Sequence, residues 1–348
     1  MLLHGAAAHA QRSDTVTTIR LNGFVDAYYA YDTARPADGE RRFTTQPVRH
    51  DEVNVNLAWL GVTVERKRTR AHVALQAGTS VQANYAGEPT NGATSGPAVS
   101  RFIQEAVVGI RLRDRVWIDG GIYSSYIGLE SWSSSDNPTY TRSFVADFTP
   151  YYLSGARLTW QATPKLSAQL HLTNGWQNIS ENNRSKSAGV RLDYSLNPAT
   201  VISYANFVGN ERPSGRKQEL RVFNQLMAKG RLPTGTSWQA QLDVGNQRGR
   251  TWYGAVAIAK QPLTPAVALV GRVERYADPH QIIVETAQPN AFVGSSASVG
   301  VDVEVDAGVR WRSELRTLQT TAALFSSGAA SRPSRGGSTL VTSLSFAF

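Results

Sequence analysis

Residues 338–348, STLVTSLSFAF, alternate between apolar side chains and small or polar ones. Leu344, Phe346 and Phe348 take every second position, and serine or alanine fills the positions between them. Because successive side chains of a β-strand point to opposite faces, this period of two predicts a strand with one apolar face. On this segment alone, a half-buried strand of a soluble domain is an equal alternative.

The same alternation recurs along the chain in segments of roughly ten residues, each bounded by turn-forming residues. Four clear examples are residues 71–85, 165–178, 236–247 and 297–305. In the first segment Val81 and Tyr85 are expected to continue the apolar face of the strand, and in the second Trp176 does so. Helical periodicity is almost absent, so the pattern predicts an all-β protein.

The connections between these segments alternate in length. Short turns are expected near residues 66–69, 113–115, 163–165, 197–199, 232–235, 262–265 and 305–307. Longer polar loops are expected near residues 33–50, 86–99, 128–149, 179–186, 210–218, 279–291 and 327–338, with a shorter one near 246–250. Short periplasmic turns and long extracellular loops are typical of outer-membrane barrels. The sequence therefore predicts a transmembrane antiparallel up-and-down β-barrel of about sixteen strands, within a range of 14–18.

A soluble all-β protein, such as a propeller or a pair of sandwiches, is the alternative fold. The polar faces of soluble sheets look at bulk water and usually carry many Lys and Glu residues. Here those faces carry mainly Gln, Ser, Asn, Thr and Gly, which suits a wet barrel interior, and Trp and Tyr lie near strand ends. Aromatic residues at strand ends are typical of the girdles at membrane interfaces, so the pattern favours the membrane barrel.

The composition excludes several other classes of protein. There is no cysteine, and the mean hydropathy of −0.30 includes no run of about twenty apolar residues that would predict a transmembrane helix. Hydropathy is blind to membrane β-barrels, because outward and inward residues alternate and average out. The net charge of +9 is scattered rather than clustered, which argues against a nucleic-acid partner.

The first residues have features of a secretory signal. Residues 1–10 contain a short apolar run and end in Ala8-His9-Ala10, a small-x-small pattern of the kind that precedes cleavage sites. We expect residues 1–10 to be the remnant of a signal peptide and residues 11–348 to form a single barrel domain. A plain unstructured terminus is the alternative.

Several stretches resemble the β-barrel porin family described as OmpL-like. They are residues 23–32, 43–61, 74–89, 100–112, 128–152 and 172–183. The resemblance covers nearly the whole chain after residue 11, and residues 128–152 are its most specific part. It implies a bacterial outer-membrane barrel and little about chemistry, since the family is described by its architecture.

For a pore, the charged residues that face the interior are the functional candidates. The alternation assigns these pore-lining and constriction candidates to the inner face: Arg111, Arg191, Arg272, Glu274, Asp302, Glu304, Arg310, Arg312, Glu314 and Arg316. Arginines facing acidic residues across a constriction would create a transverse field that sorts solutes by charge. An ion-pair ladder that only braces the wall is an equal alternative.

The 128–149 segment is the candidate constriction loop, because so many aromatic residues are unusual in a fully exposed loop. Its candidate residues are Glu130, Trp132, Asp136, Tyr140, Arg142 and Asp147. The aromatic rings either stack on sugars or only fix the loop in place, and the loop either narrows the lumen or seals it.

Enzymatic function is not indicated. The six histidines show no metal-ligand spacing, and no nucleophile elbow or phosphate-binding loop is present, so we expect no catalytic residues, no metal and no cofactor. The predicted function is a passive diffusion porin of the bacterial outer membrane for small hydrophilic solutes, with a slight lean toward anions. A plugged structural or surface-interaction barrel is the alternative, and a membrane-embedded lipid hydrolase is a weaker one.

The expected partners follow from this location. Arginines in the outer loops would meet the phosphates of outer-membrane lipids and lipopolysaccharide, although simple solvation explains them equally well. Leu344, Phe346 and Phe348 resemble the terminal signal that the outer-membrane assembly machinery reads, and the last strand is expected to pair with the first. A homotrimer is an open alternative.

Overall fold

The computed structural model of the chain describes residues 17–286, 291–325 and 333–348. The strands in these ranges form one closed antiparallel barrel of sixteen strands, so the predicted fold class is confirmed. The strands are β1 Thr18–Asp32, β2 Val53–Glu65, β3 Thr69–Ala77, β4 Ile103–Arg113, β5 Val116–Ser124, β6 Tyr152–Gln161, β7 Leu166–Thr173, β8 Ser187–Asn197, β9 Thr200–Asn210, β10 Leu220–Arg231, β11 Ser237–Gln247, β12 Arg250–Pro262, β13 Val267–Asp278, β14 Phe292–Asp306, β15 Val309–Thr320 and β16 Gly336–Ala347. Residues 1–10, the predicted signal remnant, lie outside the described residues.

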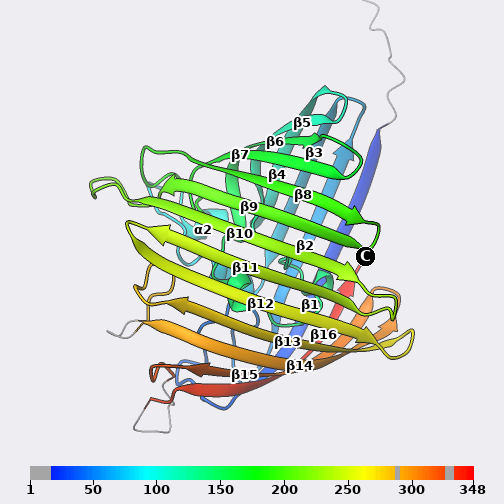
Figure 1. The fold of residues 1–348 in the computed structure, drawn as a ribbon, viewed down its shortest axis with the longest axis vertical. Coiled ribbons are helices and arrows are strands. Elements are labelled where there is room, and N and C mark those ends of the chain that lie inside the picture. Colours follow the sequence, from blue (N-terminus) through cyan, green and yellow to red (C-terminus); the bar gives the residue numbers. More distant parts are fainter. Residues whose placement is uncertain (1–16, 287–290, 326–332) are drawn as a thin grey trace, which may run out of the picture.

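Each strand pairs with its neighbours in the chain, and β16 closes the barrel against β1. The closing register places Phe346 opposite Val25 and Leu344 opposite Ala27. Short turns lie at one end of the barrel together with the C-terminus, and the long connections lie at the other end (Figure 1). Closure pairs the two outermost strands and leaves no open sheet edge, which a wall in hydrocarbon requires.

The outer face of the barrel is apolar because alternate side chains point into the lipid. Leu226, Leu242 and Val273 are each more than half exposed. Their inward neighbours Gln225 and Gln241 are almost completely buried inside the barrel. The polar residues are therefore collected in the interior, as the alternation predicts.

Helices occur only as short pieces within the long connections of the described chain. They are α1 Thr79–Tyr85, α2 Pro97–Ser100, the 3-10 turn η1 Ser134–Asp136 and α3 Phe144–Asp147. No helix in the described ranges is long and apolar enough to cross a membrane.

The prediction that the third strand continues to Tyr85 is wrong. Strand β3 ends at Ala77, and Gly78 adopts a φ of +137°, with space for no side chain because a Cβ would lie 2.3 Å from the carbonyl oxygen of Asn56. The chain then turns into α1, and Val81 and Tyr85 pack in a buried cluster inside the barrel instead of facing lipid. Glycine makes this break at no steric cost, and alternation alone could not reveal it.

The expected position of Trp176 on the apolar outer face is also wrong. Strand β7 ends at Thr173, and the Trp176 ring lies edge-on against Phe207 and Phe223, at centroid distances of 4.9 and 5.1 Å. Both phenylalanines are fully buried members of the interior cluster. An aromatic ring just beyond a strand end finds a partner inside the barrel as readily as at the lipid interface.

An arginine in place of Leu242 should destabilise the barrel by about 2–4 kcal/mol, because it puts a charge at the middle of a lipid-facing strand. Urea unfolding in lipid vesicles, followed by tryptophan fluorescence, measures the change. Ser167→Arg on β7 is the matched control, since its side chain points into the wet interior and should change stability little. Equal losses for both variants would show that the faces are assigned wrongly.

Candidate functional site

The connection between β5 and β6, residues 125–151, folds into the barrel and contacts its inner wall. Trp132, Tyr140 and Phe144 in this loop are all buried. The hydroxyl of Ser143 caps the short helix α3 by accepting a hydrogen bond from the backbone N–H of Ala146. We call residues 125–151 the inner loop; they contain the 128–149 segment that the sequence singled out.

Buried arginines of the wall hold the inner loop by its backbone carbonyls. Arg272 of β13 donates to the carbonyl oxygen of Thr141 at 2.5 Å. Arg312 of β15 donates to the carbonyl oxygens of Ser134 and Asn137 at 2.5 and 2.9 Å. Charged donors make the stronger class of hydrogen bond, so these contacts fix the loop against the wall.

Buried carboxylates of the same wall hold the backbone N–H groups of the inner loop. Glu314 accepts from the N–H of Thr141 at 2.7 Å, and Glu274 accepts from the N–H of Phe144 at 2.5 Å. Arg272 forms ion pairs with both carboxylates, at 3.1 and 3.2 Å. The wall charges therefore neutralise one another as they bind the loop, which a buried charge requires.

Arg316 completes the same group. Its guanidinium pairs with Glu274 at 2.7 Å and lies 4.8 Å from the centroid of the Phe144 ring. Arg272, Arg312 and Arg316 are each at most 2% exposed. We call Arg272, Glu274, Arg312, Glu314 and Arg316 the wall network; their polar groups meet the inner loop rather than open solvent.

Further anchors lie on other strands. Asp26 of β1 accepts hydrogen bonds from the hydroxyls of Ser134 and Tyr140. Arg191 of β8 donates to the carbonyl oxygen of Tyr126 at 2.6 Å, and Gln225 of β10 accepts from a backbone N–H at the start of the loop. Sequence reasoning did not select Gln225, because nothing in the alternation distinguishes it from other inward glutamines.

The remaining pore-lining candidates lie apart from this group or at its edge. Arg310 donates to the carbonyl oxygen of Ser135 at 2.9 Å, and Asp302 pairs with Arg312 at 3.1 Å. Glu304 is exposed near the turn end of β14. Arg111 lies on the opposite wall, where its guanidinium is 5.0 Å from the centroid of the Trp117 ring.

Three charged candidates of the inner loop are packed inside it. Glu130 accepts a hydrogen bond from the N–H of Ser143, and Arg142 donates to the carbonyl oxygen of Ala146 at 2.9 Å. Asp147 lies 3.9 Å from the guanidinium of Arg142. Burial raises the pKa of both Glu130 and Asp147, against the opposing effect of nearby arginines.

The tip of the inner loop remains accessible. Asp136 is exposed there, and residues 135–138 line a hollow of about 280 Å³ together with Arg231, Lys260 and Arg310. A second hollow of about 470 Å³ shares Pro138 and Arg231 with the first, so the two adjoin.

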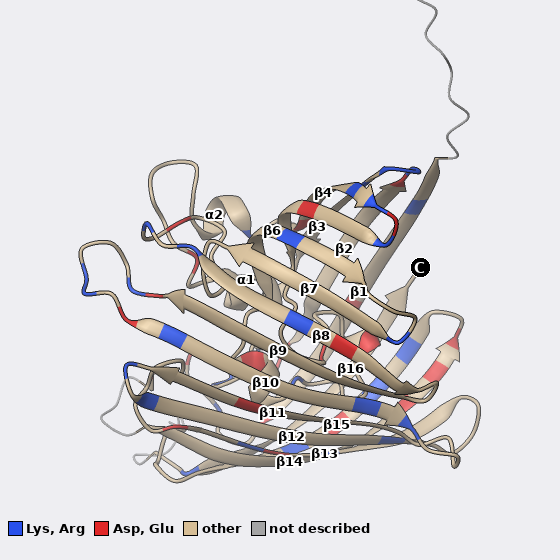
Figure 2. Ribbon diagram, turned by 45° about the horizontal axis from the view of Figure 1, so that its top comes forward, with Lys and Arg blue, Asp and Glu red and all other residues tan. Residues whose placement is uncertain are grey.

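The second hollow also reaches Lys229 of β10, and Figure 2 shows basic positions toward both ends of this strand. No acidic side chain in the described ranges forms an ion pair with Lys229 or Arg231, whereas Lys260 pairs with Asp302. Sequence reasoning missed Lys229, Arg231 and Lys260, although the alternation of β10 and β12 places all three on the inner face. The space beside the loop tip is therefore bordered by basic residues.

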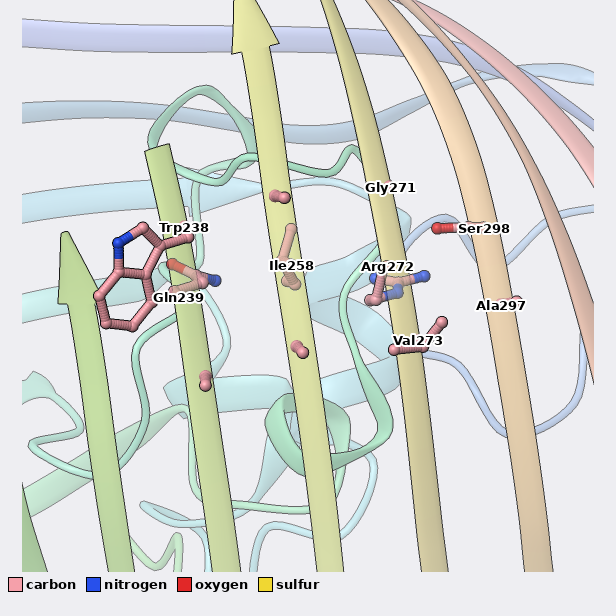
Figure 3. Close-up of a pocket in the computed structure, with 11 residues that line it drawn as sticks. Trp238, Gln239, Ile258, Gly271, Arg272, Val273, Ala297 and Ser298 are labelled. Carbon is pink, nitrogen blue, oxygen red and sulfur yellow. The ribbon is translucent and has the colours of Figure 1, made fainter. Parts of the chain in front are cut away.

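Another hollow lies on the lipid side of the barrel. Small residues such as Ala240, Ala257 and Ala297 leave a shallow depression of about 530 Å³ in the outer face of β11–β14, with Trp238 and Val273 at its rim (Figure 3). It opens away from the inner loop, so it is no part of the candidate constriction.

Much of the positive charge in the outer loops is paired. Glu219, between β9 and β10, binds Arg212 at 3.0 Å, Arg248 at 3.2 Å and Arg250 at 2.8 Å. Hydrogen bonds from Arg212 and Gln247 lower the pKa of Glu219 to about 2. These three arginines are thus already occupied by one carboxylate. The described residues contain no group of three or more side chains suited to a metal ion.

The closed sixteen-stranded wall with one loop folded inside defines the architecture of an outer-membrane porin. The anion-selective porin from Comamonas acidovorans superimposes with a TM-score of 0.60 at 11% identity, over 96% of this chain and 100% of that one. The outer membrane channel DcaP of Acinetobacter baumannii gives a TM-score of 0.63 at 9% identity, over 95% and 97% of the two chains. At these identities the likeness concerns the fold alone.

Residues 18–348 match the family described as "Putative beta-barrel porin-2, OmpL-like". The chain belongs to this porin family, and its place is the bacterial outer membrane. The resemblance seen in the sequence is thereby confirmed. A comparison with curated protein sequences gives no significant match.

Replacing Arg312 with alanine should loosen the inner loop, because the carbonyls of Ser134 and Asn137 lose a buried charged donor. The chain has no cysteine, so Ser135→Cys gives a single thiol at the loop tip. Its labelling rate with a water-soluble maleimide should rise about tenfold in the Arg312→Ala background. Arg20→Ala is the control, because it removes only an exposed ion pair with Glu65 at the end of the barrel, and it should leave the labelling rate unchanged. Equal labelling rates in the unaltered, Arg312→Ala and Arg20→Ala backgrounds would contradict the claim that Arg312 holds the inner loop.

Acid should release the outer loop that Glu219 holds. A lowered pKa contributes stability that is complete above the ordinary carboxyl pKa of 4.5 and is lost as the pH falls through about 2. Hydrogen exchange of residues 211–219, corrected for intrinsic rates, should therefore show less protection at pH 2 than at pH 6. The Glu219→Gln variant should show, at both pH values, the weak protection that the unaltered chain shows at pH 2. If this variant kept the pH response of the unaltered chain, Glu219 would not be the group that holds the loop.

Proposed function

We propose that the protein is a passive diffusion channel for small hydrophilic solutes across the bacterial outer membrane. The observation that carries the proposal is the position of the inner loop. Its later part is bound to β13, β15 and β1, its start is bound to β8 and β10, and the adjoining hollows lie between its tip and β10–β12. In this proposal the hollows beside the tip leave a path past the loop, so that the loop narrows the lumen instead of sealing it.

In this proposal the wall network has a mechanical role. Its arginines and carboxylates hold the loop against the wall, because most of their strong contacts are made with the loop or with one another. Solutes then pass the loop tip in water and avoid the hydrocarbon. Porin family membership and porin fold both support a channel rather than an enzyme.

A lean toward anions belongs to the same proposal. Lys229 and Arg231 have no acidic partner in the described chain, and Arg310 contacts a backbone carbonyl at the loop tip. Asp136 is the exposed acid on the loop side. The space beside the tip therefore has an excess of positive charge, and a low-dielectric wall extends the reach of that charge into the lumen.

We also propose the roles that the sequence suggested for the two ends of the chain. Residues 1–10 act as a signal remnant, and residues 11–348 form the single barrel domain. Leu344, Phe346 and Phe348 are read by the assembly machinery; the Phe348 ring covers Gly23 so closely that a Cβ there would lie 2.2 Å from it.

We propose in addition that unpaired arginines of the outer loops contact lipid or lipopolysaccharide phosphates. Assembly as a homotrimer is supported only by analogy of fold with a trimer form of OmpT from Vibrio cholerae, at a TM-score of 0.59 and 6% identity over 95% of this chain and 99% of that one.

Refolded protein in a planar bilayer should give stable conductance steps and, under a KCl gradient, a reversal potential that favours chloride. Lys229→Glu combined with Arg231→Glu should shift the chloride-to-potassium permeability ratio several-fold toward potassium, because it reverses the charge beside the loop tip. The control is the double variant Lys67→Glu and Arg68→Glu in the β2–β3 turn, which makes the same change in net charge away from the lumen. It should shift the permeability ratio little.

Two results would overturn parts of the proposal. Equal shifts for both double variants would show that the space beside the loop tip is not the ion path. A folded protein that never conducts would favour the plugged, surface-interacting barrel instead.

A further inference from the structure

A polar hollow lies between two of the long connections, residues 174–186 after β7 and residues 211–219 after β9. Its volume is about 340 Å³. The side chains that border it include three arginines, two serines and a glutamine, namely Arg184, Arg212, Arg216, Ser185, Ser214 and Gln218. None of the described residues that line it is acidic or aromatic. We call it the outer hollow.

Hydrogen bonds between the two connections give the outer hollow a defined shape. The backbone N–H of Ser214 donates to the carbonyl oxygen of Asn182 at 2.9 Å. The buried side-chain amide of Asn183 donates to the carbonyl oxygen of Asn210 at 3.1 Å. Each connection is therefore bound to the other through its backbone, so the side chains at their junction are held around a common space.

A tight turn places two of the arginines beside this space. The N–H of Arg216 donates to the carbonyl oxygen of Pro213 at 3.1 Å, and Gly215 between them adopts a φ of +82°. A positive φ at the third position is what a type II turn requires, and glycine adopts it without strain. Arg212 precedes the turn and Arg216 ends it, and both line the outer hollow. Figure 2 shows the basic positions on this connection between β9 and β10.

Positive charge is in excess around the outer hollow. Arg184 and Arg216 are exposed, and neither forms an ion pair with another residue of the described ranges. Arg212 is held by Glu219, but the same carboxylate also binds two further arginines. One negative charge balances only one of three guanidiniums, so this group also keeps a net positive charge.

The other acidic residues of the two connections are engaged elsewhere. Glu181 forms an ion pair with Lys186. Glu211 accepts hydrogen bonds from the backbone N–H of Trp176 and the hydroxyl of Ser187. Neither carboxylate lines the outer hollow, so the hollow lacks an acidic side chain that would repel an anion.

The donors of the outer hollow suit an anion with several acceptor oxygens. A guanidinium has five N–H donors and no acceptor, and it binds carboxylate or phosphate through two parallel hydrogen bonds. A carboxylate has only two oxygens, which one guanidinium already satisfies. A terminal phosphate carries a charge of about −1.5 to −2 at pH 7 and three acceptor oxygens, so it can be shared among several guanidiniums.

We propose that the outer hollow binds the terminal phosphate of a phosphate monoester between Arg184, Arg212 and Arg216. The phosphates of lipopolysaccharide and those of soluble sugar phosphates offer the same chemistry. The proposal deepens the proposed contact between outer-loop arginines and phosphates, and it rests on that function only where the lipid is the source. Binding itself requires no conduction.

Calorimetric titration of the refolded, detergent-solubilised protein with glycerol phosphate tests the site. Binding should saturate, and neither glycerol nor glycerate should compete well, because glycerol lacks a charge and glycerate has a carboxylate in place of the phosphate. Arg184→Gln combined with Arg216→Gln should weaken the affinity about tenfold or more through the loss of two charged donors.

The matched control is the double variant Arg66→Gln and Arg68→Gln. It removes two exposed arginines from the β2–β3 turn at the other end of the barrel and should bind glycerol phosphate like the unaltered chain. Heat-modified gel mobility checks that both double variants are folded.

A second titration identifies the source of the phosphate. The protein is placed in phosphatidylcholine vesicles that also contain lipid A, or an amount of phosphatidylglycerol with equal charge, whose phosphate is a diester. Binding of glycerol phosphate that is weakened by lipid A alone assigns the outer hollow to the lipid. Equal binding in both kinds of vesicle assigns it to soluble phosphate esters.

The outcomes separate this proposal from the pore. No saturable binding of glycerol phosphate in detergent, equal competition by glycerate, or equal affinities for the two double variants would each overturn the outer hollow as a phosphate site. Conductance steps in KCl are recorded on the same preparations, so failure of the pore would be seen independently of phosphate binding.

Discussion

The structure of the interior depends on the buried ion pairs of β13 and β15 and on the hydrogen bonds that these charges make with the inner loop. Arg272 and Arg316 share Glu274, and Arg272 also pairs with Glu314, all at almost zero exposure. Taking these charges out of water is costly, and the cost is offset only when every charge has partners. The backbone of the inner loop supplies the missing ones, so the loop and the network require each other.

The charged residues inside the barrel are therefore of two kinds: those enclosed between the wall and the inner loop, and those that face the open hollows. The wall network is enclosed, and its charges are paired with one another or, for Arg312, with Asp302. Lys229 and Arg231 lie beyond the loop tip with no acidic partner in the described residues, so their field extends into the hollows beside them. We therefore propose that bracing and solute selection fall to different residues, although the alternation assigns all of them to the same inner face.

The sequence was sufficient to predict the barrel because a strand between lipid and water must alternate. Sixteen strands, the pairing of β1 with β16 and the inward direction of Arg310, Arg312 and Arg316 all follow from that rule. Alternation could not predict whether an inward side chain would be buried under the inner loop or exposed to water. Whether an inward arginine meets water or a carbonyl depends on a loop whose path is set by contacts distant in the sequence, such as Arg272 with Thr141.

The errors have the same origin. Val81, Tyr85 and Trp176 keep the period of two past the ends of their strands, yet each turns inward to the aromatic clusters. An apolar side chain gains as much from a packed interior as from lipid, so its pattern does not reveal which of the two it meets.

The central claim is that solutes pass on the β10 side of the tip of the inner loop and not on the β14 side. Single cysteines at Lys229 and Ser298 test it, since Ser298 is the buried register partner of both Arg272 and Arg316. A bulky methanethiosulfonate reagent added during a bilayer recording should lower the current stepwise for Lys229→Cys and leave Ser298→Cys unchanged. A block at Ser298→Cys with none at Lys229→Cys would contradict the account.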